Sequence, residues 1–167
     1  FGLNIQALPD GLEPDDRVTE LEVQPGLKTL AESLSALFTN ATGRALLIDY
    51  GTTEARPSDT LRSYQNGAQI DPLAAPGLSE LTCDVDFRRL ARLASTLELS
   101  TSGPVSQSAF LLRLGAEARL NQLAKAHPDR ADDLFTGIRR LTAPAEMGER
   151  FHALCFSSSN LPVPAGF

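Results

Sequence analysis

The sequence predicts an α/β fold built on a parallel sheet, and three observations support this prediction. Residues 43–51 read G-R-A-L-L-I-D-Y-G, so a wholly apolar run stands between two glycines. Such a run is typical of a strand that helices bury on both faces. An extended segment and a helical pattern precede it, which together give a βαβ-like unit over residues 18–51. Further helical patterns follow, and a second apolar run comes after them at residues 151–156.

The first part of this unit is an expected strand followed by an expected helix. In residues 18–23, apolar and acidic side chains largely alternate, which favours a strand near a sheet edge. Pro25 suits the first position of a helix. Behind it, apolar residues recur at helical spacing and give one apolar face: Leu27, Leu30, Leu34, Leu37 and Phe38. The helix should end within residues 40–43.

Asp49 and Tyr50 follow the apolar run of the central strand directly. In open α/β sheets, ligands bind just beyond the carboxyl ends of the strands, so an acid and a phenol at this point are candidate site residues. The alternative is that Asp49 simply ends a strand in a turn.

Residues 52–84 are predicted to be a long loop on the substrate side of the sheet. They contain several prolines and glycines, no helical period, and one short candidate strand at residues 60–64. A loop of this length is uncommon in a compact domain unless it is functional or disordered. Because it leaves the end of the central strand, we expect it to face the substrate.

The remaining elements are mostly helical. Asp84 is the expected N-cap of a helix that runs to about residue 97. Residues 98–102 are a weak strand candidate, and helical patterns follow at about 106–114, 116–126 and 130–141. Residues 151–156 are a possible returning strand, and the tail after them is expected to be coil.

The composition is that of a globular domain without a nucleic-acid partner. The chain has 167 residues, 42% hydrophobic and 22% charged, which suits one domain with a sizeable core. Its formal charge of −6 would repel nucleic-acid phosphates. Cys83, Cys155 and the two histidines show no metal-ligand spacing and no disulfide framework. We therefore expect no metal and a reducing compartment, and no apolar run approaches the ~20 residues of a membrane span.

The sequence lacks the usual nucleotide cradle. No G-x-G-x-x-G, no P-loop and no G-x-S-x-G can be written anywhere in it. From the residues alone, the prediction stops at an α/β sheet with an acidic, loop-covered strand end.

Several segments resemble the second half of the MidA-like family of S-adenosylmethionine-dependent methyltransferases. The matching segments are A-L-L-I-D-Y-G at 45–51, D-T-L-R at 59–62, A-P-G-L-S-E-L-T-C-D-V-D-F at 75–87, G-P-V-S-Q at 103–107, F-L-L-R-L-G at 110–115 and M-G-E-R-F at 147–151. Each is weak alone, but their order and spacing are quite specific. Mitochondrial members of this family are protein-arginine methyltransferases that assist the assembly of respiratory complex I.

The resemblance implies the carboxy-terminal part of a class I, Rossmann-like methyltransferase sheet. Residues 43–51 would form its fifth strand, residues 151–156 its last and antiparallel strand, and residues 106–141 a helical insertion before that strand. The chain begins with Phe1, and S-adenosylmethionine would be bound mainly by a preceding half, so this part alone should be inactive. The implied location is the cytoplasm of a bacterium or, alternatively, the mitochondrial matrix.

The resemblance also implies a protein substrate whose arginine is methylated. Carboxylates hold a planar guanidinium at two points, so acidic groups near the strand end suit this chemistry. We assign Asp49 to catalysis and the following residues to substrate binding: Tyr50, Asp59, Thr82, Asp84, Asp86 and Gln107. Each of three residues also has a structural alternative. Asp84 could cap the helix that follows it, and Asp86 could complement the positive end of the same helix. Tyr50 could be an ordinary half-buried strand residue. The alternative for the whole chain is a non-catalytic module that docks a partner protein.

Overall fold

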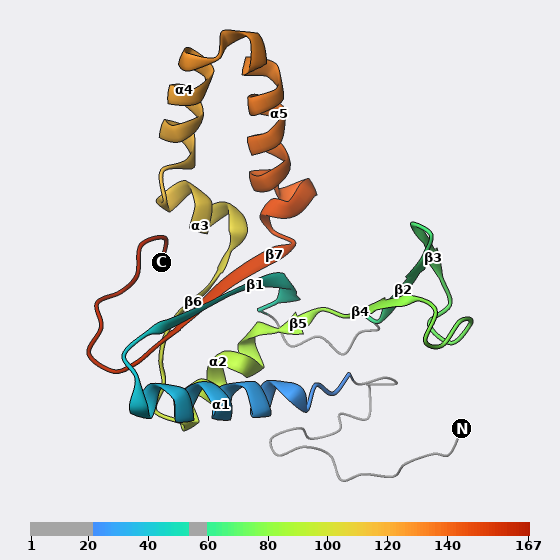
Figure 1. Cartoon of the computed structure of the whole chain (residues 1–167), viewed down its shortest axis with the longest axis vertical. Coiled ribbons are helices and arrows are strands. Elements are labelled where there is room, and N and C mark those ends of the chain that lie inside the picture. Colours follow the sequence, from blue (N-terminus) through green and yellow to red (C-terminus); the bar gives the residue numbers. More distant parts are fainter. Residues whose placement is uncertain (1–21, 54–59) are drawn as a thin grey trace.

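The computed structural model describes residues 22–53 and 60–167, and its centre is a four-stranded sheet (Figure 1). The strand order is β5-β1-β7-β6, with β5 at Val85–Asp86, β1 at Arg44–Thr52, β7 at Phe151–Ser157 and β6 at Ser100–Ser106. β1 runs parallel to β5, whereas β7 runs antiparallel to both of its neighbours. The predicted central strand and the returning antiparallel strand are therefore confirmed. The weak strand candidate at 98–102 is confirmed in part, because β6 begins at Ser100 and continues to Ser106.

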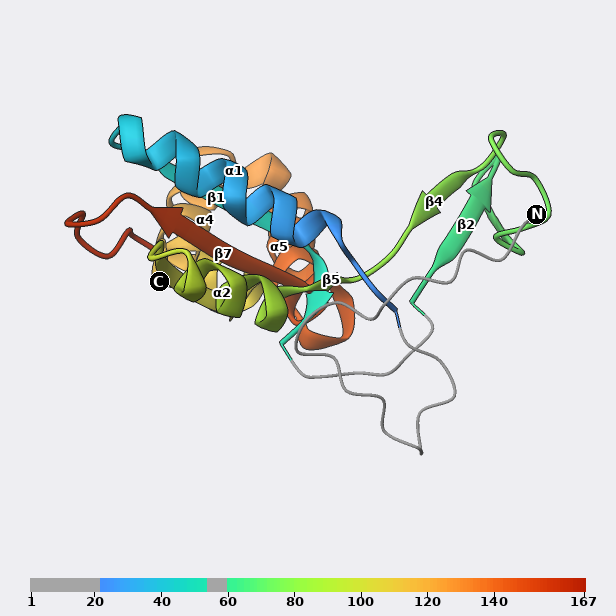
Figure 2. The same cartoon turned by 90° about the horizontal axis from the view of Figure 1, so that it is seen from below.

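Two helices cover one face of this sheet (Figure 2). They are α1, Gly26–Asn40, and α2, Phe87–Thr96. The core lies between them and the sheet, where α2 contributes Phe87 and Leu90 and β7 contributes Leu154 and Phe156, all fully buried. The helix predicted behind Pro25 is confirmed. Of the strand expected at residues 18–23, only residues 22 and 23 are described, and neither is in a strand.

The prediction that β1 is buried on both faces is wrong for the described structure. Ala45 and Leu47 are part-buried and pack against the core under α1 and α2. On the opposite face, the side chains of Leu46 and Ile48 remain 50% and 45% exposed. The physical reason is that α1 and α2 both lie on the same side of the sheet.

Residues 60–84 are not a continuous loop, as the sequence suggested, but fold largely into a second small sheet. Its strands are β2 (Arg62–Gln65), β3 (Ala68–Ile70) and β4 (Glu80–Thr82), in the antiparallel order β3-β2-β4. Asn66 and Gly67 join β2 to β3 with φ of 54° and 78°. Positive φ at both central residues is the geometry of a tight hairpin turn, for which Asn-Gly is the preferred pair.

A helical arm lies between β6 and β7 (Figure 1). It consists of α3 (Gln107–Arg113), α4 (Ala116–Ala126), the short helix η1 (Pro128–Arg130), α5 (Ala131–Thr142) and the π-helical turn η2 (Pro144–Gly148). Gly115 takes a φ of 86° between α3 and α4, a conformation that glycine adopts without steric cost. The three helices expected in residues 106–141 are therefore present. No helix in the described ranges is long and apolar enough to cross a bilayer.

Candidate functional site

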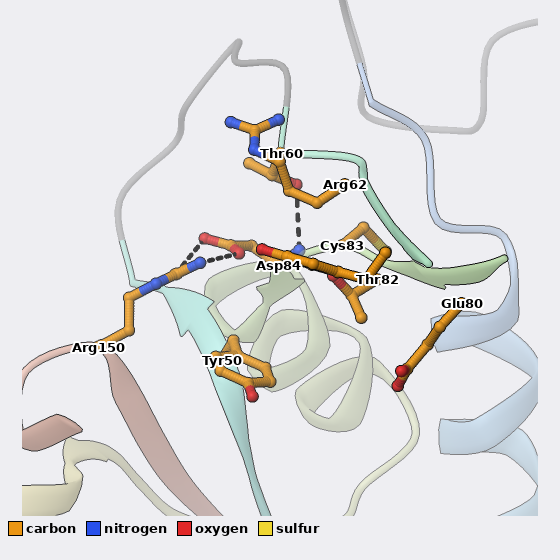
Figure 3. Close-up of a pocket in the computed structure, with 9 residues that line it drawn as sticks. Tyr50, Thr60, Arg62, Glu80, Thr82, Cys83, Asp84 and Arg150 are labelled. Atoms are coloured by element: carbon orange, nitrogen blue, oxygen red, sulfur yellow. Dashed lines mark hydrogen bonds and ion pairs between the residues drawn. The ribbon is translucent and has the colours of Figure 1, made fainter. Parts of the chain in front are cut away.

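A pocket of about 250 Å³ lies where β1 ends and the small sheet begins (Figure 3). Three parts of the chain position its walls: the end of β1, the segment from Thr60 to Asp84, and the turn before β7. The lining residues are Tyr50, Thr60, Arg62, Tyr64, Glu80, Thr82, Cys83, Asp84 and Arg150. The predicted location beyond the carboxyl end of the central strand thus does contain a pocket.

Asp84 and Arg150 form a two-point ion pair in the wall of this pocket. Arg150 Nη1 donates to Asp84 Oδ2 at 2.5 Å, and Arg150 Nη2 donates to Asp84 Oδ1 at 2.6 Å. This hydrogen bonding raises the pKa of Arg150 above its usual value. The guanidinium carbon of Arg150 also lies 5.5 Å from the centre of the Tyr50 ring, within the range of a cation–π contact. The pocket wall therefore already holds one guanidinium that contacts both a carboxylate and an aromatic ring.

Hydrogen bonds from Glu22 and Gln24 tie the pocket's segments together. The Glu22 carboxylate accepts from the backbone N–H groups of Thr60 and Leu61 at 2.6 and 2.8 Å, and from the Thr60 hydroxyl at 2.5 Å. The Thr60 hydroxyl oxygen in turn accepts from the Asp84 N–H at 3.0 Å. Gln24 donates to the Asp84 carbonyl at 2.5 Å and accepts from the N–H of Asp86 at 3.2 Å. The backbone around Asp84 is therefore held from two sides.

Cys83 lines the pocket but is not set up as a nucleophile. Burial raises the pKa of its thiol, and the negative charges of Glu22, Asp84 and Asp49 raise it further. The reactive species of cysteine is the thiolate, so a raised pKa lowers the reactive fraction near neutral pH. The arrangement favours a binding role for this wall of the pocket.

Glu80 differs from Asp84 in having no side-chain partner among the described residues. Within residues 22–53 and 60–167, no hydrogen bond or ion pair engages its side chain. It stands on the opposite side of the pocket from Arg150 (Figure 3). Glu80 is therefore the carboxylate of this pocket that can take up a cation from outside.

The structure brings together only some of the residues predicted from the sequence. Tyr50, Thr82 and Asp84 line the pocket, and Asp59 lies outside the described residues. Asp49 is exposed and does not line the pocket; its carboxylate accepts from the N–H of Tyr50 at 2.8 Å.

Asp86 and Gln107 have structural contacts outside the pocket. Asp86 is the N-cap of α2, and its carboxylate accepts from the N–H of Arg89 at 2.7 Å. The prediction that Asp84 caps this helix is therefore wrong, because α2 begins after the short strand β5. Gln107 is buried and donates from Nε2 to the carbonyl of Leu141 at 2.8 Å, which joins α3 to α5.

The sequence-based assignment missed Arg150 and Glu80. Arg150 comes directly before a strand expected to return antiparallel to β1. Its position at the same sheet edge as Tyr50 follows from that direction and could have been inferred. Glu80 had no such signal, because the small sheet that places it was not predicted.

Gly51 and Gly103, the two glycines within strands of the main sheet, are closely packed and leave no room for a ligand. A glycine-rich cofactor loop needs open space over its glycines, so that the ligand can approach the backbone closely. Space beside Gly51 is filled by Val85 and Phe87, and space beside Gly103 by Ala153 and Phe167. Neither glycine can therefore belong to such a loop.

Comparison with known proteins identifies the family. Residues 4–105 match the model of a family described as putative S-adenosyl-L-methionine-dependent methyltransferases. The mouse protein arginine methyltransferase NDUFAF7, mitochondrial, is 36% identical over 143 residues, which are 84% of this chain and 32% of that protein. The Drosophila melanogaster homologue of that protein is 42% identical over 114 residues, covering 67% of this chain and 26% of its own length.

Solved structures agree in fold. A COG1565 superfamily protein from Burkholderia thailandensis matches with a TM-score of 0.71 and 25% identity, over 82% of this chain and 39% of that one. A second structure from that organism, a likely methyl transferase bound to S-adenosyl-homocysteine, matches with a TM-score of 0.71 and 24% identity, over 83% of this chain and 37% of that one. The fold is thus that of the Rossmann-like methyltransferases, and the chain spans about a third of the curated relatives' length. The family match covers more than half of this chain, which therefore belongs to the family of putative S-adenosyl-L-methionine-dependent methyltransferases.

Proposed function

We propose that this chain is the carboxy-terminal, substrate-side part of an S-adenosylmethionine-dependent methyltransferase that acts on arginine side chains of a protein. The family match and the names of the relatives support the reaction class and the kind of substrate. The observation that carries the proposal is the pocket at the end of β1, where a guanidinium already contacts both the carboxylate of Asp84 and the ring of Tyr50. The cofactor would be bound by the part of the protein that this chain does not span.

The proposed role of this pocket is to bind and orient the substrate's guanidinium. Asp84 is engaged by Arg150, so Glu80 is the carboxylate that receives the incoming cation, with Tyr50 and Thr82 as neighbouring walls. A two-point carboxylate contact fixes both the position and the plane of a guanidinium. Holding a reactant in one orientation is a large part of what an enzyme contributes to a displacement reaction.

The test compares Glu80→Gln with Asp49→Asn in the intact methyltransferase. Charge-assisted hydrogen bonds contribute roughly 1.5–3 kcal/mol each, so Glu80→Gln should slow single-turnover methylation of an arginine peptide about ten- to a hundredfold. The affinity for S-adenosylmethionine should not change. Glu117→Gln, on α4 and away from the pocket, is the matched control.

Two outcomes would contradict the proposal in different ways. Normal methylation by Glu80→Gln, together with a loss in Asp49→Asn, would move the substrate contact to the residue that the sequence suggested. Saturable binding of an arginine peptide by the intact protein, with no methyl transfer, would instead support the non-catalytic docking module.

The remaining parts of the proposal concern the cofactor and the location. Titration calorimetry on this chain alone should show no saturable binding of S-adenosylmethionine, and micromolar binding would overturn the assignment of the cofactor site to the rest of the protein.

The names of the relatives support the mitochondrial matrix rather than a bacterial cytoplasm. Fluorescence microscopy of the tagged full-length protein in its own cells would test this location.

A further inference from the structure

The helical arm carries an open apolar groove between α4 and α5. The groove has a volume of about 380 Å³ and is lined by Leu111, Ala116, Arg119, Leu120, Leu123, Asp133, Leu134, Gly137, Ile138 and Leu141. Neither α4 nor α5 contains a single buried residue. The two helices contact each other and project away from the sheet as a hairpin (Figure 1).

The spacing of the groove residues is typical of helices that pack against a further layer. Leu120 and Leu123 are three residues apart on α4, and on α5 Leu134, Ile138 and Leu141 follow one another at four and three residues. This spacing places each set on one face of its helix. Two antiparallel helices cannot bury both of their apolar faces alone, whereas four helices in a bundle can.

Two opposite charges mark the two ends of the groove. Arg119 lies in the first turn of α4, near the base of the arm, and Asp133 lies in the first turn of α5, near its tip. Both side chains line the groove, and neither forms an ion pair within the described parts of the chain. The groove therefore has a positive end and a negative end.

We propose that a second copy of this chain covers the groove, so that two arms form an antiparallel four-helix bundle. A two-fold axis across the middle of the groove would place Arg119 of each copy against Asp133 of the other. A contact between identical surfaces must be self-complementary, and a groove with opposite charges at its two ends meets this requirement. The apolar residues between the charges would then be buried at the centre of the interface. This inference does not depend on the proposed methyltransferase function.

The test is sedimentation equilibrium of the 167-residue chain and of charge-reversed variants. The unchanged chain should be a dimer. Arg119→Glu places two acids opposite each other at both ends of the interface, and Asp133→Arg places two arginines there. Each variant alone should dimerise about tenfold more weakly or worse.

Mixing the two variants separates this arrangement from a general effect of charge. In a mixed pair, the acid introduced by Arg119→Glu would face the arginine introduced by Asp133→Arg at one end of the interface. At the other end, Arg119 and Asp133 would keep their original pairing. The mixture should therefore form heterodimers although neither variant forms a stable dimer alone. Lys125→Glu, a charge reversal on α4 outside the groove, is the matched control and should leave dimerisation unchanged.

Three outcomes would overturn the proposal. The first is a monomeric unchanged chain, and the second is a failure of the mixed variants to associate. The third is loss of the dimer in Ile48→Ser, on the exposed face of β1, while Leu123→Gln in the groove leaves the dimer intact. Circular dichroism on each variant shows that it is folded. Leu123 and Ile48 make a suitable pair for this comparison, because neither residue is buried within one copy.

Discussion

The carboxylate of Asp84 and the guanidinium of Arg150 face each other at two points, across 66 positions of sequence. Asp84 lies between β4 of the small sheet and β5 of the main sheet, and Arg150 lies directly before β7. The pair therefore links the connection between the two sheets to the central strands. The side chain of Asp84 is 13% exposed and that of Arg150 is 49% exposed.

A double-mutant cycle on this pair should give a coupling free energy of about 1 kcal/mol. Two-point geometry strengthens the pair, but solvent screens the half-exposed Arg150 and keeps the value below that of a buried ion pair. The cycle uses Asp84→Asn, Arg150→Gln and the double variant, with urea unfolding as the measurement. Lys28 and Glu32, 4.0 Å apart on the exposed side of α1, are the control and should couple by less than about 0.5 kcal/mol. Equal coupling free energies in the two pairs would contradict the expectation that two-point geometry strengthens the pair of Asp84 and Arg150.

The side chain of Asp86 should stabilise the folded state by capping α2. The Asp86 carboxylate satisfies the Arg89 N–H in the first turn of α2, so Asp86→Ala should lower the free energy of unfolding by about 1 kcal/mol. Asp86→Asn keeps an acceptor oxygen and should retain most of that stability. Urea unfolding of both variants checks this. A loss in Asp86→Asn as large as that in Asp86→Ala would show that the charge and not the hydrogen bond matters.

The elements that could be predicted are those whose signal is local and long. β1 and α1 have continuous apolar patterns, and β7 is wholly apolar at its centre, where Ala153 and Leu154 are fully buried. The small sheet has strands of three or four residues in a segment rich in proline and glycine, so no periodicity could develop. Its two local signals were the candidate strand at residues 60–64, which overlaps β2, and the Asn66-Gly67 turn.

The site was harder to predict than the fold, because its residues come from distant segments. Asp84 and Asp86 are two positions apart, and spacing alone could not decide which of them caps α2. The deciding feature is the short parallel pairing of β5 with β1, Gly51 with Val85 and Thr52 with Asp86, which delays the start of the helix. That pairing is a tertiary contact and leaves no local pattern.

Gly51 should be intolerant of any side chain. A Cβ built at this position would lie 2.3 Å from the carbonyl oxygen of Val85 and 2.6 Å from the ring of Phe87. Gly51→Ala must therefore push β5 and α2 away from β1, which should cost about 2 kcal/mol of unfolding free energy. Gly26→Ala, where a Cβ meets nothing within 4 Å, is the control and should change the stability by less than about 0.5 kcal/mol. Equal effects on thermal unfolding would contradict the close packing of β5 on β1.

His152 should make the fold less stable as the pH falls. It lies on β7 with its ring 5.7 Å from that of Phe87, and burial lowers its pKa below the usual value. Its Nδ1 is buried without a hydrogen-bond partner in the described structure. Protonation would therefore place a charge where it is poorly solvated.

The direction of this effect follows from the pH at which the folded and the unfolded chain each bind a proton at His152. Above about pH 6.5, the usual pKa of histidine, His152 is neutral in both states and its contribution to stability is fully present. As the pH falls below that value, the unfolded chain binds a proton first, so the free energy of unfolding decreases until the lower pKa of the folded state is passed. His152→Phe removes this protonation while keeping an aromatic ring beside Phe87. The free energy of unfolding of both proteins is measured with urea at about pH 8 and about pH 5.5. Relative to the unchanged chain, the variant should therefore be more stable at the lower pH than at the higher pH. A difference that stays constant across this range would mean that His152 binds its proton equally well in the folded and unfolded states.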